Sequence, residues 1–249
     1  LDKIGPVRSS RHYFLDYALE NDAIYVHYGW SPQAQYDISN LGVNNINGIS
    51  ESESSFWRVK DKRAPHNVAT STAKILSIAE RKGYKTTSTK ESVLKYVTDE
   101  VELTDGQSAE KITIPYSYSN DVEYTYDATT KRYQRYSKGV KETDWSTGEN
   151  ITTKNIIITF AKNSVLNDGE NKDRQTLSNI GTLNGYYITN GKAIKITCEK
   201  TSRSAQTVYK DLDGNEIKVN DGNTYVQICP INAKVTIEGA EETVTEDVD

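Results

Sequence analysis

Methionine is absent from the 249 residues, and cysteine occurs only twice. Two thiols without clustered histidines cannot close a zinc site. Cys198 and Cys229 are therefore either the two halves of one disulfide in an exported protein or two small core residues in a reducing compartment. Because not even an initiator methionine stands at Leu1, we expect the native protein to start upstream, where any signal peptide or lipid-attachment cysteine would lie.

Long apolar runs and an excess of basic charge are missing as well. The longest apolar stretch, residues 156–161, is far shorter than the roughly 18 residues of a membrane helix, so no segment is predicted to span a bilayer. The 35 acidic residues outnumber the 30 basic ones, and the net charge of −5 argues against general affinity for nucleic acid. Phenylalanine occurs 3 times and tyrosine 17 times, which suits half-exposed clefts and sheet faces.

The length fits one or two domains, and a change of hydrophobic period indicates two. We predict an α+β fold, with an N-terminal α/β-type layered domain over residues 1–103 and a mostly antiparallel β domain over residues 104–249. In the first half the apolar spacing predicts four helices and a buried strand over residues 23–29. The first helix starts after Ser9-Ser10, and the second starts at Ser31-Pro32. The third ends before Gly83, and the fourth follows a capping box at residues 88–91.

From about residue 104 the period is two, and turn residues punctuate the chain. Strands are predicted at residues 112–114, 123–126, 132–136, 155–159, 186–189, 192–196 and 224–228. Asn190-Gly191 gives the strongest hairpin signal, because a type I′ turn needs positive φ at both central positions. Cys198 and Cys229 end β-rich runs and are expected on neighbouring strands. After Lys234 six acidic residues and no basic ones remain, which predicts a solvated tail.

Arginine is sparse, with 9 residues against 21 lysines, yet four of the nine fall within the first 63 residues: Arg8, Arg11, Arg58 and Arg63. A guanidinium fork holds carboxylate or phosphate through two hydrogen bonds, and a helix start adds free N–H groups. Residues 5–11 therefore suggest anion capture. In the alternative interpretation Arg8 and Arg11 pair with carboxylates such as Asp16 or Glu20 and only fix the helix.

Two of the three histidines lie where strands are expected to end. His27 closes the first predicted strand, and His66 lies in a Pro-His-Asn turn. Loops after strands often carry function, although each histidine alone can equally serve packing. We predict that the ligand-binding residues converge on one cleft of the first domain: Arg8, Arg11, His27, Arg63, His66 and Asn67. No catalytic residue is assigned, since Gly-x-Ser-x-Gly is absent around Ser9, Ser10 and Ser31, and no metal or cofactor is predicted.

Aromatic residues offer a second surface with two interpretations. The set comprises Trp57, Trp145, Tyr124, Tyr126, Tyr133 and Tyr136. Amphipathic rings on a wet sheet face can stack on sugars, and cross-strand packing explains the same pattern.

These motifs resemble the YerB-like family, a family of predicted lipoproteins of Gram-positive bacteria without assigned function. The first half contributes Gly5-Pro6-Val7-Arg8-Ser9-Ser10-Arg11, Tyr25-Val26-His27-Tyr28-Gly29-Trp30-Ser31, Phe56-Trp57-Arg58 and Arg63-Ala64-Pro65-His66-Asn67. The second half contributes Tyr133-Gln134-Arg135, Thr143-Asp144-Trp145-Ser146-Thr147-Gly148, Asn155-Ile156-Ile157, Asn190-Gly191-Lys192 and Tyr225-Val226-Gln227-Ile228-Cys229-Pro230. In such proteins we expect tryptophans near positions 198 and 225, where this chain has Cys198 and Tyr225.

The resemblance implies an extracytoplasmic protein whose lipid-anchored leader and first strands lie upstream of this chain. Two classes of function follow. The first is an envelope protein that binds a small anionic ligand or a cell-wall polymer or glycan through its arginines and histidines, with no nucleic-acid partner and with membrane contact only through the anchor. The second is a hydrolase of an ester or phosphodiester that uses a histidine as general acid and base. The sequence favours the first, because it shows no paired acid, metal set or activated nucleophile.

Overall fold

The computed structural model describes residues 1–170 and 172–239 and divides the chain into two compact units. Unit 1 contains Leu1–Val93 together with two segments from the second half of the chain, Asn163–Ile180 and Lys200–Thr207. Unit 2 contains Leu94–Lys162, Gly181–Glu199 and the chain from Val208 onward. The first passage from unit 1 to unit 2 thus lies ten residues before the change of period predicted near residue 103.

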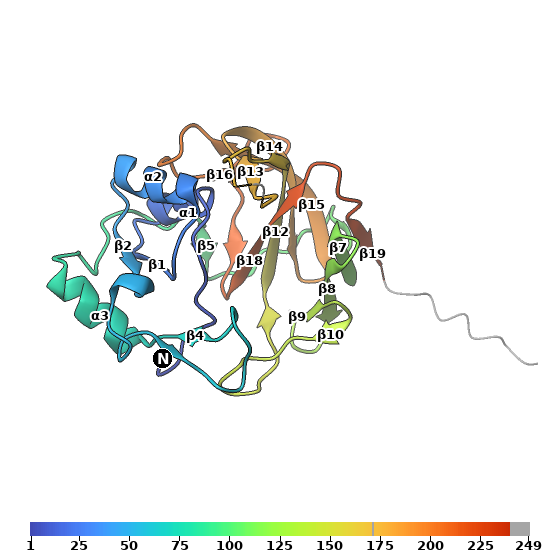
Figure 1. Cartoon of the computed structure of the whole chain (residues 1–249). Coiled ribbons are helices and arrows are strands. Elements are labelled where there is room, and N and C mark those ends of the chain that lie inside the picture. The colour runs from blue at the N-terminus through green and yellow to red at the C-terminus, as the bar shows by residue number, and fades with distance from the viewer. Residues whose placement is uncertain (171, 240–249) are drawn as a thin grey trace, which may run out of the picture. The chain divides into compact units, whose positions relative to one another are not determined.

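Unit 1 holds the helices and five short strands (Figure 1). The helices are α1 (Phe14–Glu20), α2 (Pro32–Asn40), α3 (Thr72–Arg81) and the single 3-10 turn η1 (Gly48–Ser50). The strands are β1 (Tyr25–His27), β2 (Asn45–Asn47), β3 (Trp57–Arg58), β4 (Val68–Ala69) and β13 (Gln175–Ser178). The parallel pair β1 and β2 and the antiparallel pair β3 and β4 form two small sheets.

Local signals explain where these helices begin and end. Ser31 caps α2 by accepting a hydrogen bond from Ala34 N at 3.3 Å, with Pro32 in the first turn, as the sequence predicts. The helix predicted after Ser9-Ser10 starts later, at Phe14, and Tyr13 at its N-cap makes no side-chain cap. No helix follows the predicted capping box, because Ser88 instead donates to Asp22 Oδ2 and accepts from Lys90 N. None of the helices in the described ranges is long and apolar enough to cross a membrane.

Two apolar clusters hold unit 1 together. One gathers Val7, Ile46, Phe56, Val68 and Ile78 from five separate segments. The other joins α1 to α2 through Leu15, Ile38 and Val43, and the two helices lie side by side in Figure 1. Burial of these apolar side chains is the main contribution to the stability of unit 1. Its strands are too short to be stable on their own.

Unit 2 is built from strands, as predicted for the second half of the chain. They are β5 (Tyr96–Val97), β6 (Gln107–Ser108), β7 (Lys111–Ser117), β8 (Asn120–Asp127), β9 (Arg132–Ser137), β10 (Val140–Lys141), β11 (Thr152–Thr153), β12 (Asn155–Val165), β14 (Gly181–Thr189), β15 (Lys192–Lys200), β16 (Val208–Lys210), β17 (Val219–Asn220), β18 (Thr224–Pro230) and β19 (Thr236–Glu238). The last residues of β12 and β15 belong to unit 1. No helix occurs between residues 112 and 235 of the described chain, which confirms the β-rich half of the predicted α+β fold.

Two sheets supply most of unit 2. The first has the order β10-β9-β8-β7-β19, with β11 also paired to β9. The second runs β12-β14-β15-β16, with β18 paired to β12 in parallel and β6 paired to β15. The strand β13 also pairs with β12, whose last three residues belong to unit 1 as β13 does. The predicted hairpin between β14 and β15 is present, with φ of 49° at Asn190 and 71° at Gly191.

Three sequence expectations for this region are wrong. Cys198 lies on β15 and Cys229 on β18, and the strand order places β12 and β14 between them, so they are buried free thiols rather than neighbours. The predicted helix near residues 93–97 is the strand β5, which pairs in parallel with β17. The predicted solvated tail begins later than Lys234, because Thr236–Glu238 form β19 on the edge of β7. Residues 240–249 of that tail lie outside the described residues.

Candidate functional site

The segment around Arg8 is held between two other parts of unit 1. Val7 N donates to Val68 O at 2.8 Å, and Tyr28 N donates to Arg8 O at 2.8 Å. The extended backbone alternates, so Val7 is buried in the apolar cluster while the Arg8 side chain is exposed. Backbone pairing on both sides therefore fixes where the Arg8 guanidinium emerges.

Arg8 shares a small hollow of about 120 Å³ with a second arginine, Arg58 of β3. Tyr28, Pro65 and Ser9 are among the other lining residues, and no acidic residue lines the hollow. Arg58 donates through NH1 to Asn67 Oδ1 at 2.8 Å, and its guanidinium lies 5.8 Å from the centre of the Tyr28 ring. These contacts hold one face of the Arg58 guanidinium and leave its charge without a carboxylate.

His66 reaches the same guanidinium from the turn that follows Arg63. Arg8 NH1 lies 3.1 Å from His66 Nδ1 and 3.3 Å from Nε2, so the guanidinium donates to a ring nitrogen that carries no proton. The backbone turn is closed by His66 N, which donates to Arg63 O at 2.9 Å, and the Arg63 side chain is exposed. Arg8, Arg58, His66 and Asn67 therefore form one cluster, which we call the arginine hollow.

Four of the five arginines outside this region pair with a carboxylate, and the fifth, Arg132, donates to Thr152 and Asn223. Arg81, Arg135, Arg174 and Arg203 each pair with at least one carboxylate. In the described part of the chain, no ion pair involves Arg8, Arg11, Arg58 or Arg63. Asp16 and Glu20 pair with Arg203 and Lys200 instead, so the alternative in which they pair with Arg8 and Arg11 is wrong.

Two predicted members of the cleft have other roles. His27 is only 1% exposed, and its Nδ1 lies 2.8 Å from Gly29 O while Nε2 lies 3.0 Å from Asn45 Oδ1. Its ring is therefore a packing element that ties β1 to Asn45 of β2 and to the loop at Gly29, and it offers no free nitrogen to a ligand. Arg11 turns back onto its own segment, where NH1 donates to Ser9 Oγ and to Ser10 O, both at 2.9 Å.

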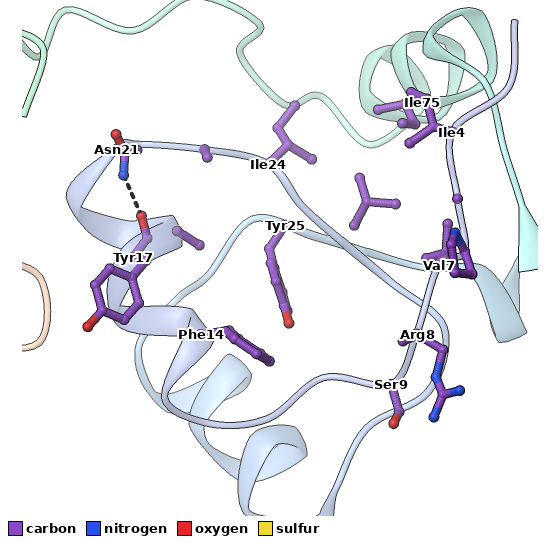
Figure 2. A pocket seen from close by; sticks show the side chains of 15 residues that line it. Ile4, Val7, Arg8, Ser9, Phe14, Tyr17, Asn21, Ile24, Tyr25 and Ile75 are labelled. Atoms are coloured by element: carbon purple, nitrogen blue, oxygen red, sulfur yellow. Dashed lines mark hydrogen bonds between the residues drawn. The ribbon is translucent and has the colours of Figure 1, made fainter. Parts of the chain in front are cut away.

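An apolar cavity of about 710 Å³ begins where the arginine hollow ends. The two share Val7, Arg8 and Ser9 as lining residues. Figure 2 shows the Tyr25 and Phe14 rings and the Val7, Ile24 and Ile75 side chains around the cavity, with the Arg8 guanidinium beside Ser9 at its edge. No carboxylate lines this cavity. Burial raises the pKa of Tyr25, which keeps its hydroxyl neutral at physiological pH.

Sequence reasoning missed a second, carboxylate-rich cluster in unit 1. The buried carboxylates of Asp16 and Asp37 accept hydrogen bonds from one guanidinium, Arg203 Nε at 2.6 Å and Arg203 NH1 at 2.7 Å. Asn179 donates to Asp16 Oδ2 at 3.0 Å, and Gln33 donates to Asp37 Oδ1 at 2.8 Å. The single guanidinium of Arg203 bridges both carboxylates, and the cluster fixes residues 163–180 and 200–207 onto α1 and α2.

His12 borders this cluster. Its Nε2 lies 3.0 Å from Thr176 Oγ1, while Nδ1 is buried without a hydrogen-bond partner. Burial is the largest cause that lowers the pKa of His12, and Asp37 and Asp16 oppose that shift. A hydroxyl-histidine pair is the start of a nucleophilic triad, but a triad needs a carboxylate on the other ring nitrogen, and Nδ1 has none. No local signal could have revealed the pair, because its members are 164 positions apart.

Unit 2 contains a separate polar hollow of about 400 Å³. Tyr126 and Tyr136 line it together with Arg132, Lys141 and Asn150. Tyr124 and Tyr133, which the sequence offered as partners in the same aromatic surface, are fully buried. Cross-strand packing therefore accounts for half of that group of tyrosines, and only Tyr126 and Tyr136 face the hollow.

Comparison with known proteins identifies the family of this chain. Residues 1–85 match the N-terminal domain, and residues 112–226 the C-terminal domain, of the family described as protein of unknown function (DUF3048). The chain is 30% identical over 237 residues to "Putative lipoprotein YerB" of Bacillus subtilis (strain 168), covering 92% of this chain and 67% of that protein. The chain belongs to the DUF3048 family. This confirms the resemblance stated from the motifs.

A solved structure of the family agrees with the fold. The crystal structure of YerB protein from Bacillus subtilis matches with a TM-score of 0.81 at 29% identity, covering 94% of this chain and 78% of that chain. Neither name states a ligand or a reaction. The chemistry of the arginine hollow is therefore argued from the residues of this chain alone.

Proposed function

We propose that this DUF3048 protein binds an anionic ligand at the arginine hollow. The observation that carries the proposal is that Arg8 and Arg58 line one hollow with no acidic residue, and that neither guanidinium has a carboxylate partner in the described ranges. Two exposed guanidinium groups that line one hollow repel each other, and a counter-charge relieves that repulsion. A phosphate or carboxylate group supplies that charge and accepts bidentate hydrogen bonds.

Other features of the hollow support an anion. His66 faces Arg8 through an unprotonated nitrogen, so it orients the guanidinium without neutralising it. Asn67 and Tyr28 position Arg58 in the same way. Polar partners that leave a positive charge uncompensated are typical of binding sites for anions, whereas Arg174 and Arg203 of this chain pair with carboxylates.

The name of the relative, a putative lipoprotein, supports a location for this ligand binding. We infer that the protein acts outside the cytoplasm and is held at the membrane by a lipid attached upstream of the residues in this chain. The ligand would then be an anionic component of the cell envelope, such as a wall polymer or glycan that carries phosphate or carboxylate groups.

Calorimetric titration with inorganic phosphate tests the proposal. The wild-type chain is compared with Arg8→Gln and Arg58→Gln, and Arg81→Gln is the matched control because Arg81 is exposed and paired with Glu51. Loss of a charge-assisted hydrogen bond is worth about 1.5–3 kcal/mol, so each hollow variant should bind roughly 10- to 100-fold more weakly. Equal affinity in all four proteins, or no binding by the wild type at millimolar phosphate, would overturn the proposal.

A further inference from the structure

We infer that the ligand is an amphipathic anion, with its charged group in the arginine hollow and an apolar chain or ring in the adjoining cavity. This inference rests on the proposed function and names the class of ligand. A purely polar anion would use the hollow of about 120 Å³ and leave the cavity of about 710 Å³ empty. An amphipathic one would fill both.

The arginine hollow and the apolar cavity adjoin each other. Arg8 and Ser9 line both the hollow and the cavity, as does Val7. A head group held by the Arg8 guanidinium therefore lies at the entrance of the cavity, and a substituent on it points either into the cavity or into solvent. Figure 2 shows Arg8 and Ser9 at one edge and the side chains of Ile4, Ile24 and Ile75 farther in.

The lining of the cavity favours an apolar group. Its side chains are almost all aliphatic or aromatic, and its size lies within the 300–1,000 Å³ typical of small-molecule sites. Asn21, which follows α1, also lines the cavity, and its Nδ2 donates to Tyr17 O at 2.8 Å. Phe14, at 45% exposure, leaves a ring on the rim that an apolar ligand would cover.

The charge pattern decides the orientation. The only ionisable groups that line the cavity are Arg8 and the tyrosines Tyr17 and Tyr25, and no carboxylate is present to repel an anion. Tyr25 stays neutral because burial raises its pKa. An apolar cavity with positive charge at one edge fits a phosphate or carboxylate that carries a hydrocarbon substituent.

The test compares three probes: inorganic phosphate, hexyl phosphate and 1-hexanol. Binding is measured by calorimetric titration of the full chain, of Arg8→Gln and of Ala23→Trp, which places a large ring in the cavity at an exposed position. Leu76→Trp is the control, because Leu76 is exposed on α3 and does not line the cavity. Each buried methylene strengthens binding up to about fourfold, so hexyl phosphate should bind about tenfold or more tightly than inorganic phosphate.

The outcomes separate this inference from the proposed function. If it is correct, Ala23→Trp removes the advantage of hexyl phosphate and keeps phosphate binding, whereas Arg8→Gln weakens both and Leu76→Trp changes neither. Equal affinities for phosphate and hexyl phosphate would overturn the amphipathic ligand and leave the anion site standing. Hexyl phosphate binding that ignores Arg8→Gln and matches 1-hexanol would overturn the inference, because the head group would then contribute nothing. Absence of phosphate binding in every protein would overturn the proposed function itself.

Discussion

Arg8 and His66 are 58 positions apart in the sequence and in direct contact in the fold, with Arg8 NH1 3.1 Å from His66 Nδ1. The contact uses one of the five N–H donors of the guanidinium and none of its charge. An arginine oriented in this way is prepared to bind a second, anionic partner.

The shape of the Arg8 head group gives the first prediction. In Arg8→Lys the charge is kept and the planar fork is lost, so phosphate affinity should fall between those of the wild type and Arg8→Ala. The affinity of all three proteins should decrease as salt is raised from 50 to about 500 mM, because the site is open to solvent. Calorimetry at two salt concentrations measures both effects. If Arg8→Lys binds phosphate as weakly as Arg8→Ala, the prediction is wrong, because the retained charge would then contribute nothing to the affinity.

The buried ion pair of Glu20 and Lys200 gives the second prediction. Lys200 Nζ lies 2.8 Å from Glu20 Oε2, and the side chains are only 2% and 4% exposed. Removing one charge strands the other in a low-dielectric interior, so Lys200→Met should lower the free energy of unfolding by about 3–5 kcal/mol. Urea denaturation measures the loss. The double variant Glu20→Leu with Lys200→Met should recover part of it, since no unpaired charge is left behind; a loss below about 1 kcal/mol in the single variant would contradict the assignment.

His12 predicts how stability depends on pH. Burial lowers its pKa below the ordinary 6.5 of an unfolded histidine. As pH falls through about 6.5, the unfolded chain takes up a proton that the folded chain does not, so its contribution is complete above that pH and is lost on acidification. His12→Gln should therefore lose less stability between pH 7 and pH 5 than the wild type.

Denaturant midpoints at several pH values measure this slope. His66→Gln serves as the control, because His66 is exposed. The same pH slope in the wild type and in His12→Gln would show that the His12 ring does not stay neutral in the fold.

The two thiols give the fourth prediction. Burial raises the pKa of Cys198 to about 12 and that of Cys229 to about 11, so both are protonated and covered at pH 8. A thiol reagent such as Ellman's should titrate no cysteine in the native protein and two in urea, because the thiolate is the reactive species. Rapid release of colour from the native chain would contradict the placement of both residues.

Local chemistry explains what the sequence could predict. The Ser31-Pro32 cap of α2 and the Asn190-Gly191 turn depend on residues within four positions of one another, and both are present as expected. The strand β5 was missed because it is defined by pairing with β17, more than 120 residues away, while the local pattern looked helical.

The site shows the same division. Residue type pointed to Arg8, His66 and Asn67, and the structure adds Arg58 through the shared hollow. The predicted Arg63 is exposed and does not line the hollow. His27 was misassigned, since its position at a strand end does not reveal that Gly29 O and Asn45 Oδ1 surround its ring. His12 and Arg203 could not be found at all, because the partners of each are more than 160 positions away in the sequence: Thr176 for His12, and Asp16 and Asp37 for Arg203.

The most direct test of the account is to locate a bound anion by anomalous diffraction. Selenate replaces phosphate in crystals of the protein, and because the unlabelled protein contains no selenium, the selenium signal comes from the added ion alone. We expect an anomalous peak within hydrogen-bond distance of the guanidinium groups of both Arg8 and Arg58, and its loss in Arg58→Gln. A map with no peak there, or with its only peak beside Arg132 and Lys141 in the hollow of unit 2, would contradict the central claim.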